Sequence, residues 1–155
     1  MALALEKLLI PTTGVPQPPV VHETESSLNI SVVFTSVTPT LAALRKAGDL
    51  ANQLRGHITL LVPQVVPYPL PLESPPALLD WNERRFRVIA SQSPVETMVR
   101  LYLCRDRLEL LTSTLKPHSL VVIGGRTRWW WPTSEERLAR TLRRAGQEVI
   151  YTGTE

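Results

Sequence analysis

The fold is decided by residues 30–66, ISVVFTSVTPTLAALRKAGDLANQLRGHITLLVPQVV. Residues 30–37 are mostly apolar and rich in β-branched side chains, which predicts a strand buried on both faces. Apolar residues then recur at helical spacing up to Arg55, at Leu41, Leu44, Ala47, Ala51 and Leu54. Residues 57–66 form a second apolar run. A helix between two such strands predicts a parallel pair joined by a crossover.

Local signals mark both ends of this helix. Thr38 offers an N-cap oxygen, and Pro39 suits the first helical position because its missing N–H would have no partner there. Gly56 suits the turn that ends a helix. The helix is therefore expected over residues 39–55.

The alternation of strands and helices continues through the middle of the chain. Prolines are frequent between Pro63 and Pro76, so no long helix is expected there. A short helix is predicted over residues 77–84 and a strand over residues 86–91. A long helix is predicted over residues 94–115, with its apolar face interrupted at Arg105.

Three further elements complete the series. Residues 119–124 (SLVVIG) predict a strand, and Thr133-x-x-Glu136 has the spacing of a capping box that begins a helix. That helix is expected to end at Gly146, before a last strand over residues 148–152. Short apolar strands that alternate with helices predict the α/β class, with helices on both faces of a parallel sheet.

Residues 1–28 are predicted to form a proline-rich arm ahead of one α/β domain over residues 29–155. Four prolines, Pro11, Pro16, Pro18 and Pro19, favour an extended or irregular chain after at most a short helical turn over residues 2–9. The arm is either a loose tail or a strap across the domain.

Composition fits one ordinary globular domain. The chain has 155 residues, of which 43% are hydrophobic and 20% charged, and no apolar run is long enough for a membrane span. The N-terminus lacks the basic leader of a signal peptide, and Cys104 is the single cysteine, so a cytoplasmic protein without disulfides is expected. The net charge of +3 is too small to favour nucleic-acid binding.

Two neighbouring motifs follow the strand over residues 119–124. Gly124, Gly125 and Arg126 could form an anion-binding loop beyond the carboxyl end of that strand, or the glycines simply turn the chain. The run Trp129-Trp130-Trp131 has three interpretations: rings that fill space over the sheet edge, a platform for a protein partner, or a stacking surface for a ligand.

Other chemistry-bearing residues form no catalytic set. The three histidines are scattered, and no carboxylate lies at metal-ligand spacing from them. Cys104 lies beside Arg105, which would lower the thiol pKa if the side chain were exposed, but a buried, inert thiol is expected. Arg137, Arg140 and Arg144 form a basic stripe on the last helix, either a solvated face or a site for an acidic partner. The sequence therefore predicts a protein that is not an enzyme.

The region over residues 29–155 resembles the universal stress protein (UspA-like) family. The likeness rests on Ala51 and Leu54 late in the first helix, on Thr59-Leu60-Leu61 in the strand after it, and on SLVVIGGRTR over residues 119–128. A narrower likeness, on Trp81, Ser93-Pro94, Val121-Val122-Ile123 and Trp129-Trp130, is to the cytosolic C-terminal domain of bacterial amino-acid permeases.

The family resemblance implies a three-layer α/β sandwich with a five-stranded parallel sheet in the order 3-2-1-4-5. It also implies a homodimer that forms through the last strand, over residues 148–152. Nucleotide-binding members carry an acidic residue after the first strand, where this chain has Thr35. Their phosphate loop begins with a glycine matched by Gly124, but its second glycine falls on Thr127, and a shortened loop with Pro132 precedes Thr133-Ser134.

Two functional hypotheses follow. The first is a non-catalytic regulatory or interaction module with a degenerate ATP-binding loop and a protein partner at Trp129, Trp130 and Trp131. The second is a divergent signalling domain that binds an adenine nucleotide, ATP or AMP. Its nucleotide contacts would be Thr35, Gly124, Gly125, Arg126, Thr133 and Ser134.

Overall fold

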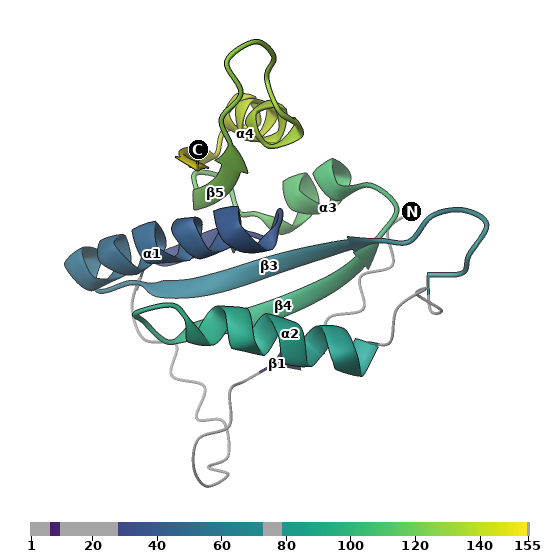
Figure 1. Ribbon diagram of the computed structural model, residues 1–155, viewed down its shortest axis with the longest axis horizontal. Coiled ribbons are helices and arrows are strands. Elements are labelled where there is room, and N and C mark those ends of the chain that lie inside the picture. The colour runs from purple at the N-terminus through teal and green to yellow at the C-terminus, as the bar shows by residue number, and fades with distance from the viewer. Residues whose placement is uncertain (1–6, 10–27, 73–78, 155) are drawn as a thin grey trace, which may run out of the picture.

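The computed structural model describes residues 7–9, 28–72 and 79–154, which form one twisted sheet with helices on both faces (Figure 1). Its elements, in chain order, are β1 (Lys7–Leu9), β2 (Asn29–Val33), α1 (Val37–Leu54), β3 (His57–Val65), α2 (Leu79–Ser91), β4 (Thr97–Cys104), α3 (Arg107–Thr114), β5 (Leu120–Arg126), α4 (Ser134–Arg144) and β6 (Glu148–Thr154).

The sheet has the order β1-β4-β3-β2-β5-β6. The five neighbouring strands β4, β3, β2, β5 and β6 are parallel. The predicted five-stranded order 3-2-1-4-5 is therefore confirmed. β1 adds a sixth, antiparallel strand beside β4, with Leu8 opposite Arg100. A helical turn was expected over residues 2–9; at residues 7–9 this is wrong, because the chain there pairs with the open edge of β4. Residues 1–6 and 10–27 of the predicted arm lie outside the described residues.

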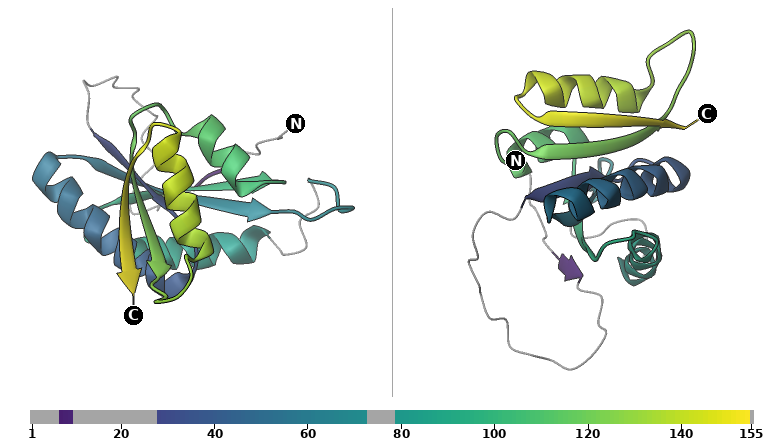
Figure 2. Two further views of the ribbon diagram at one scale, coloured as in Figure 1. Left: turned by 90° about the horizontal axis from the view of Figure 1, so that it is seen from above. Right: turned by 90° about the vertical axis from the view of Figure 1, so that its left-hand side faces the viewer.

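Two apolar layers hold the helices against the sheet. On one face, α1 packs on β2, β3 and β5 and α2 packs on β4, and Ala43, Leu44 and Ile89 are buried in one cluster with Ile30 and Leu60. On the other face, α3 and α4 cover a second cluster (Figure 2), whose buried members include Val33, Leu61, Tyr102, Leu111, Ile123 and Leu142. The alternation of β2 residues between the two clusters follows from the period of two in a strand.

The middle of the chain differs from its prediction. Residues 86–91, expected as a strand, belong to helix α2, because Phe86, Ile89 and Ala90 are buried at helical spacing on one face. Residues 94–115, expected as one helix, form strand β4 and the separate helix α3. Asp106 begins α3 as its N-cap, and its carboxylate accepts a 2.8 Å hydrogen bond from the Glu109 N–H.

Arg105, which interrupts the apolar pattern of that segment, lies at the boundary between β4 and α3. Its guanidinium donates a 2.8 Å hydrogen bond to the Val66 carbonyl and lies over the Tyr68 ring, 4.2 Å from the ring centroid. The arginine therefore holds the segment that follows β3 instead of facing outward from a continuous helix.

The ends of α1 and α4 were predicted to within a few residues. α1 begins at Val37 after the N-cap Ser36, so Pro39 is its third residue and Thr38 is not the cap. α1 is followed by Arg55 in a left-handed conformation (φ 51°), where Gly56 was expected to make the turn. The capping box of α4 is confirmed by the 3.3 Å bond from the Glu136 N–H to the Thr133 hydroxyl. Gly146 ends that helix with φ 94°.

Candidate functional site

The crevice where open α/β sheets bind ligands lies between the carboxyl ends of β2 and β5, because the chain order reverses between these strands. The structure brings Thr35 and Gly124 together at this point. The Thr35 hydroxyl donates a 2.7 Å hydrogen bond to the Gly124 carbonyl, and the Thr35 N–H donates a 3.2 Å bond to the Thr40 hydroxyl. Both polar groups of Thr35 are thus used within the fold.

The two glycines at the end of β5 permit close packing. A Cβ atom on Gly124 would lie 1.9 Å from the carbonyl oxygen of Pro39, in the first turn of α1. A Cβ atom on Gly125 would lie 2.1 Å from the Tyr151 hydroxyl and 2.8 Å from the Glu135 Cβ. Protein atoms therefore occupy the position that a side chain would take at each glycine, so both positions require a residue without a Cβ atom.

The remaining predicted contacts are spread along the loop between β5 and α4. Arg126 is exposed, and its carbonyl accepts a 3.3 Å hydrogen bond from the Tyr151 hydroxyl. Thr133 caps α4, and Ser134 is exposed at the first residue of that helix. Burial raises the pKa of the Tyr151 phenol above its ordinary value, against a smaller lowering effect of its hydrogen bond with Thr133. Tyr151 stays neutral at physiological pH and serves as a packing group between loop and strand.

Trp129, Trp130 and Trp131 project into solvent. Their exposed fractions are 90%, 82% and 76%, and the loop that carries them stands out beyond the sheet (Figure 1). The interpretation that these rings fill space over the sheet edge is therefore wrong. The Trp129 and Trp130 ring centroids lie 6.5 Å apart with a 57° tilt, so these two indoles contact each other more than the domain. Exposed apolar groups of this size mark interaction sites.

Basic side chains surround this loop. Arg126 and Arg128 are exposed beside the tryptophans, and Arg137, Arg140 and Arg144 are exposed along α4. A groove of about 350 Å³ runs between α4 and β6, lined by Thr127, Glu136, Ala139, Arg140, Arg143 and Tyr151. The predicted basic stripe is therefore present on the surface, next to the base of the tryptophan loop.

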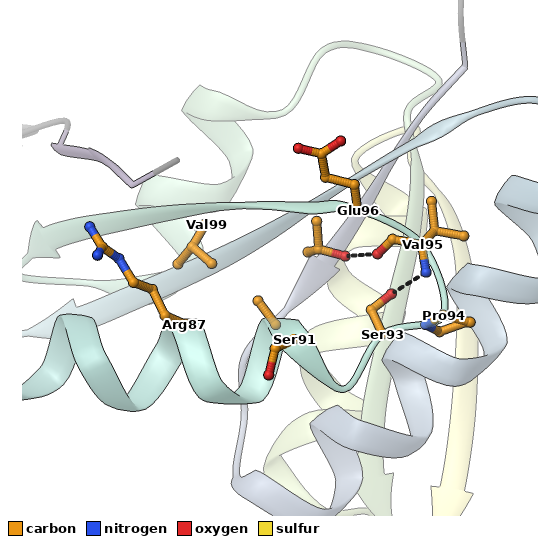
Figure 3. Close-up of a pocket in the computed structure, with 9 residues that line it drawn as sticks. Arg87, Ser91, Ser93, Pro94, Val95, Glu96 and Val99 are labelled. Carbon is orange, nitrogen blue, oxygen red and sulfur yellow. Dashed lines mark hydrogen bonds between the residues drawn. The ribbon is translucent and has the colours of Figure 1, made fainter. Parts of the chain in front are cut away.

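A second hollow, of about 230 Å³, lies away from the switch point (Figure 3). It is formed where α2 ends and β4 begins, and Arg87, Ser91, Ser93 and Glu96 contribute its polar groups. The Ser93 hydroxyl accepts a 3.3 Å hydrogen bond from the Val95 N–H and shapes the turn before β4. The sequence did not predict this hollow, because Arg87 and Ser91 were expected in a strand over residues 86–91 and Glu96 in a helix over residues 94–115.

Cys104 is the single thiol of the chain. Cys104 is buried, and burial, with a smaller contribution from Asp106, raises the pKa of its thiol above the ordinary value. This agrees with the expected inert thiol, because the reactive thiolate is suppressed. Within the described residues, no three His, Cys, Asp or Glu side chains are grouped so that they could hold a metal ion. None of the described helices combines the length and apolar character needed to span a membrane.

The arrangement defines the universal stress protein fold. The chain is similar to the structure of a universal stress protein from Archaeoglobus fulgidus, with a TM-score of 0.57 and 15% identity over 80% of this chain and 92% of that one. It is also similar to a protein of the universal stress protein family from Burkholderia pseudomallei, with a TM-score of 0.55 and 20% identity over 81% of this chain and 96% of that one. No protein-family profile and no curated protein sequence matches it.

The packing at the two glycines predicts different costs for adding a side chain at each position. We expect Gly124→Ala to lower the free energy of unfolding by about 1–3 kcal/mol, because its new methyl group meets the rigid backbone of α1. Gly125→Ala is the matched control and should cost less, because the Tyr151 hydroxyl is the end of a side chain that can move. Urea unfolding of both variants measures the difference. Wild-type stability of Gly124→Ala would contradict the close approach of the Pro39 carbonyl to this glycine.

The exposure of the tryptophans predicts that they contribute little to stability. Each of Trp129→Ala, Trp130→Ala and Trp131→Ala should change the free energy of unfolding by no more than about 0.5 kcal/mol. The control is Phe86→Ala, which removes a buried ring packed edge-on against Phe34 at 4.9 Å and should cost about 3–5 kcal/mol. A loss of several kcal/mol at any of the three tryptophans would contradict the observed exposure.

Proposed function

We propose that this chain is a divergent universal-stress-protein-like module that binds a protein partner and catalyses no reaction. The observation that carries the proposal is the exposed loop Trp129-Trp130-Trp131. Burying large aromatic rings supplies much of the binding energy at protein interfaces, and tryptophan and arginine are the side chains most often at their centres. Arg126 and Arg128 precede the three rings in the chain, so this segment offers both kinds of side chain to one partner.

The contacts at the switch point support a degenerate nucleotide site. Thr35 stands where the family's nucleotide-binding members carry an acidic residue, and its hydroxyl is bonded to Gly124. Pro39 and Tyr151 lie against the glycines of the loop, and Pro132 has no N–H to donate to a phosphate. In this proposal the chain works without a cofactor, in the cytoplasm, as expected for a protein with one cysteine and no disulfides.

The proposal includes a homodimer that forms through β6. This strand lies at the edge of the sheet, and only β5 pairs with it among the described residues. An open strand edge offers backbone donors and acceptors to a second copy. The two tryptophan loops of such a dimer would present two binding surfaces, to one partner or to two. The likeness to the cytosolic C-terminal domain of amino-acid permeases suggests a membrane transporter as the class of partner.

A second candidate function is the binding of ATP or AMP. It is favoured by the position of Gly124, Gly125 and Arg126 at the switch point, where this class of sheet binds its ligands. Arg126 is exposed and could contact a phosphate, and Thr133 and Ser134 stand at the start of α4. This candidate requires Tyr151 and Glu135 to move away from Gly125.

Tryptophan fluorescence separates the two candidates. Three of the four tryptophans lie in the loop beside Arg126, so a nucleotide bound there would change their emission. For the interaction module we expect no saturable change with ATP or AMP up to millimolar concentration, with or without magnesium, and no shift in melting temperature. Free N-acetyltryptophanamide, titrated in parallel, corrects for absorption by the nucleotide. A saturable change that is lost in Arg126→Ala would establish the second candidate instead.

Substitution of the tryptophans should abolish the binding of a partner that recognises them. We expect a protein that is cross-linked to the wild-type chain in cells to be absent with Trp129→Ala/Trp130→Ala and retained with Tyr68→Ala. Tyr68 is the matched control, because it is an aromatic side chain with 80% exposure on a different loop. Quantitative mass spectrometry of the cross-linked material measures the difference. Equal recovery with both variants would remove the loop from the proposed interface.

A further inference from the structure

The outer edge of β6 has a defined set of backbone groups. Glu148 donates its N–H to Ser119, and the Thr154 carbonyl accepts from Thr127, so the even-numbered residues of β6 direct their backbone groups toward β5 and the loop after it. Along a strand, the N–H and carbonyl groups of successive residues point alternately to one side of the strand and to the other. The N–H and carbonyl groups of Val149, Tyr151 and Gly153 therefore point away from the sheet, toward any strand that pairs with this edge.

One of these outward groups is already bonded. The Arg143 guanidinium, from the last turn of α4, donates to the Val149 carbonyl twice, from Nε at 3.2 Å and from Nη2 at 3.0 Å. The side chain of Arg143 is exposed, so this contact covers the beginning of the strand edge from the solvent side. Hydrogen bonds from a charged guanidinium are stronger than those between neutral groups.

We propose that Arg143 controls the pairing of β6 with a second copy of this chain. This inference rests on the β6 dimer of the proposed function and adds its regulation. In an antiparallel pair centred on Tyr151, Val149 of each copy lies opposite Gly153 of the other, and the Val149 carbonyl must accept the Gly153 N–H of the partner. The guanidinium and that N–H compete for the same oxygen. Pairing therefore requires Arg143 to leave the strand edge in both copies.

The neighbouring residue Arg144 has no such contact. Both arginines lie exposed in the last turn of α4, but Arg144 makes no hydrogen bond or ion pair with any described residue, whereas Arg143 has two bonds to β6. The two side chains carry the same charge one residue apart. A change that is specific to Arg143 therefore reports the contact with the edge and not the net charge of the surface.

Sedimentation equilibrium over the micromolar range tests whether Arg143 controls dimerisation. We expect the wild-type chain to dimerise weakly and Arg143→Ala to tighten the dimer dissociation constant about ten-fold, because a charge-assisted contact no longer competes in either copy. Arg144→Ala should leave the constant within about two-fold of wild type, a difference small beside the ten-fold step. Arg143→Lys keeps the charge but loses the two-point contact, so its constant should lie between those of the wild type and Arg143→Ala.

A second substitution identifies the interface. Val149→Pro removes the outward N–H of Val149 at an edge position that tolerates proline, so Arg143→Ala/Val149→Pro should return to the monomer. Melting curves of every variant confirm that the chain remains folded. A double variant that is folded and still dimeric would place the interface elsewhere and overturn the proposal.

The remaining outcomes separate the inference from the function on which it rests. Equal dissociation constants for wild type and Arg143→Ala would leave the β6 dimer standing and overturn the role of Arg143. Equal tightening by Arg143→Ala and Arg144→Ala would assign the effect to charge repulsion and would also overturn it. A monomer in every variant at the highest concentration would overturn both the β6 dimer and its proposed regulation by Arg143.

Discussion

The close approach of the first turn of α1 to strand β5 is the constraint on which the rest of the structure depends. Gly124 has no side chain, so the Pro39 carbonyl reaches the strand, and the Thr35 hydroxyl ties the end of β2 to the Gly124 carbonyl. These contacts join the two halves of the sheet where the chain order reverses. They lie at the switch point, the position that open α/β sheets use for ligands.

The exposed side chains and backbone groups on which the two proposals rest lie on the C-terminal unit β5-α4-β6. The tryptophan loop leaves β5, the arginines line α4, and the open backbone groups belong to β6. Van der Waals packing secures this unit through Leu138, Ala139 and Leu142, which are buried against the sheet. A rigid base beneath exposed aromatic rings favours recognition, because less conformational entropy is lost when a partner binds.

The sequence predicted the first half of the fold better than the second, for local reasons. Over residues 30–66, strand composition, helical spacing and end signals agree. Between residues 86 and 115 they conflict: Met98 and Leu101 match the helical spacing of Leu108 and Leu111, although residues 97–104 pair with β3 as a strand. The spacing of Phe86, Ile89 and Ala90 does indicate a helix, so α2 was recoverable from the sequence. Strand β1 was not, because its three residues acquire their conformation only by pairing with β4.

At the candidate site, too, some features follow from the sequence and others depend on tertiary contacts. Chain order alone places Thr35 beside Gly124, but the close approach of Pro39 to Gly124 and of Tyr151 to Gly125 depends on tertiary contacts that no local pattern reveals. The exposure of all three tryptophans is likewise a tertiary result, since adjacent rings could have been divided between surface and core.

Tyr151 connects the two proposed interaction surfaces. Its backbone belongs to the outward row of β6, where a second copy would pair, while its hydroxyl donates to the Arg126 carbonyl at the base of the tryptophan loop. The Thr127 N–H donates to the Thr154 carbonyl at 3.3 Å, which joins the same loop to the end of the same strand. A partner strand that fixes β6 therefore also fixes both anchors of the loop. In the proposed dimer, pairing of β6 would therefore reduce the conformational entropy that the loop loses when a partner binds, so the two proposed events would favour each other.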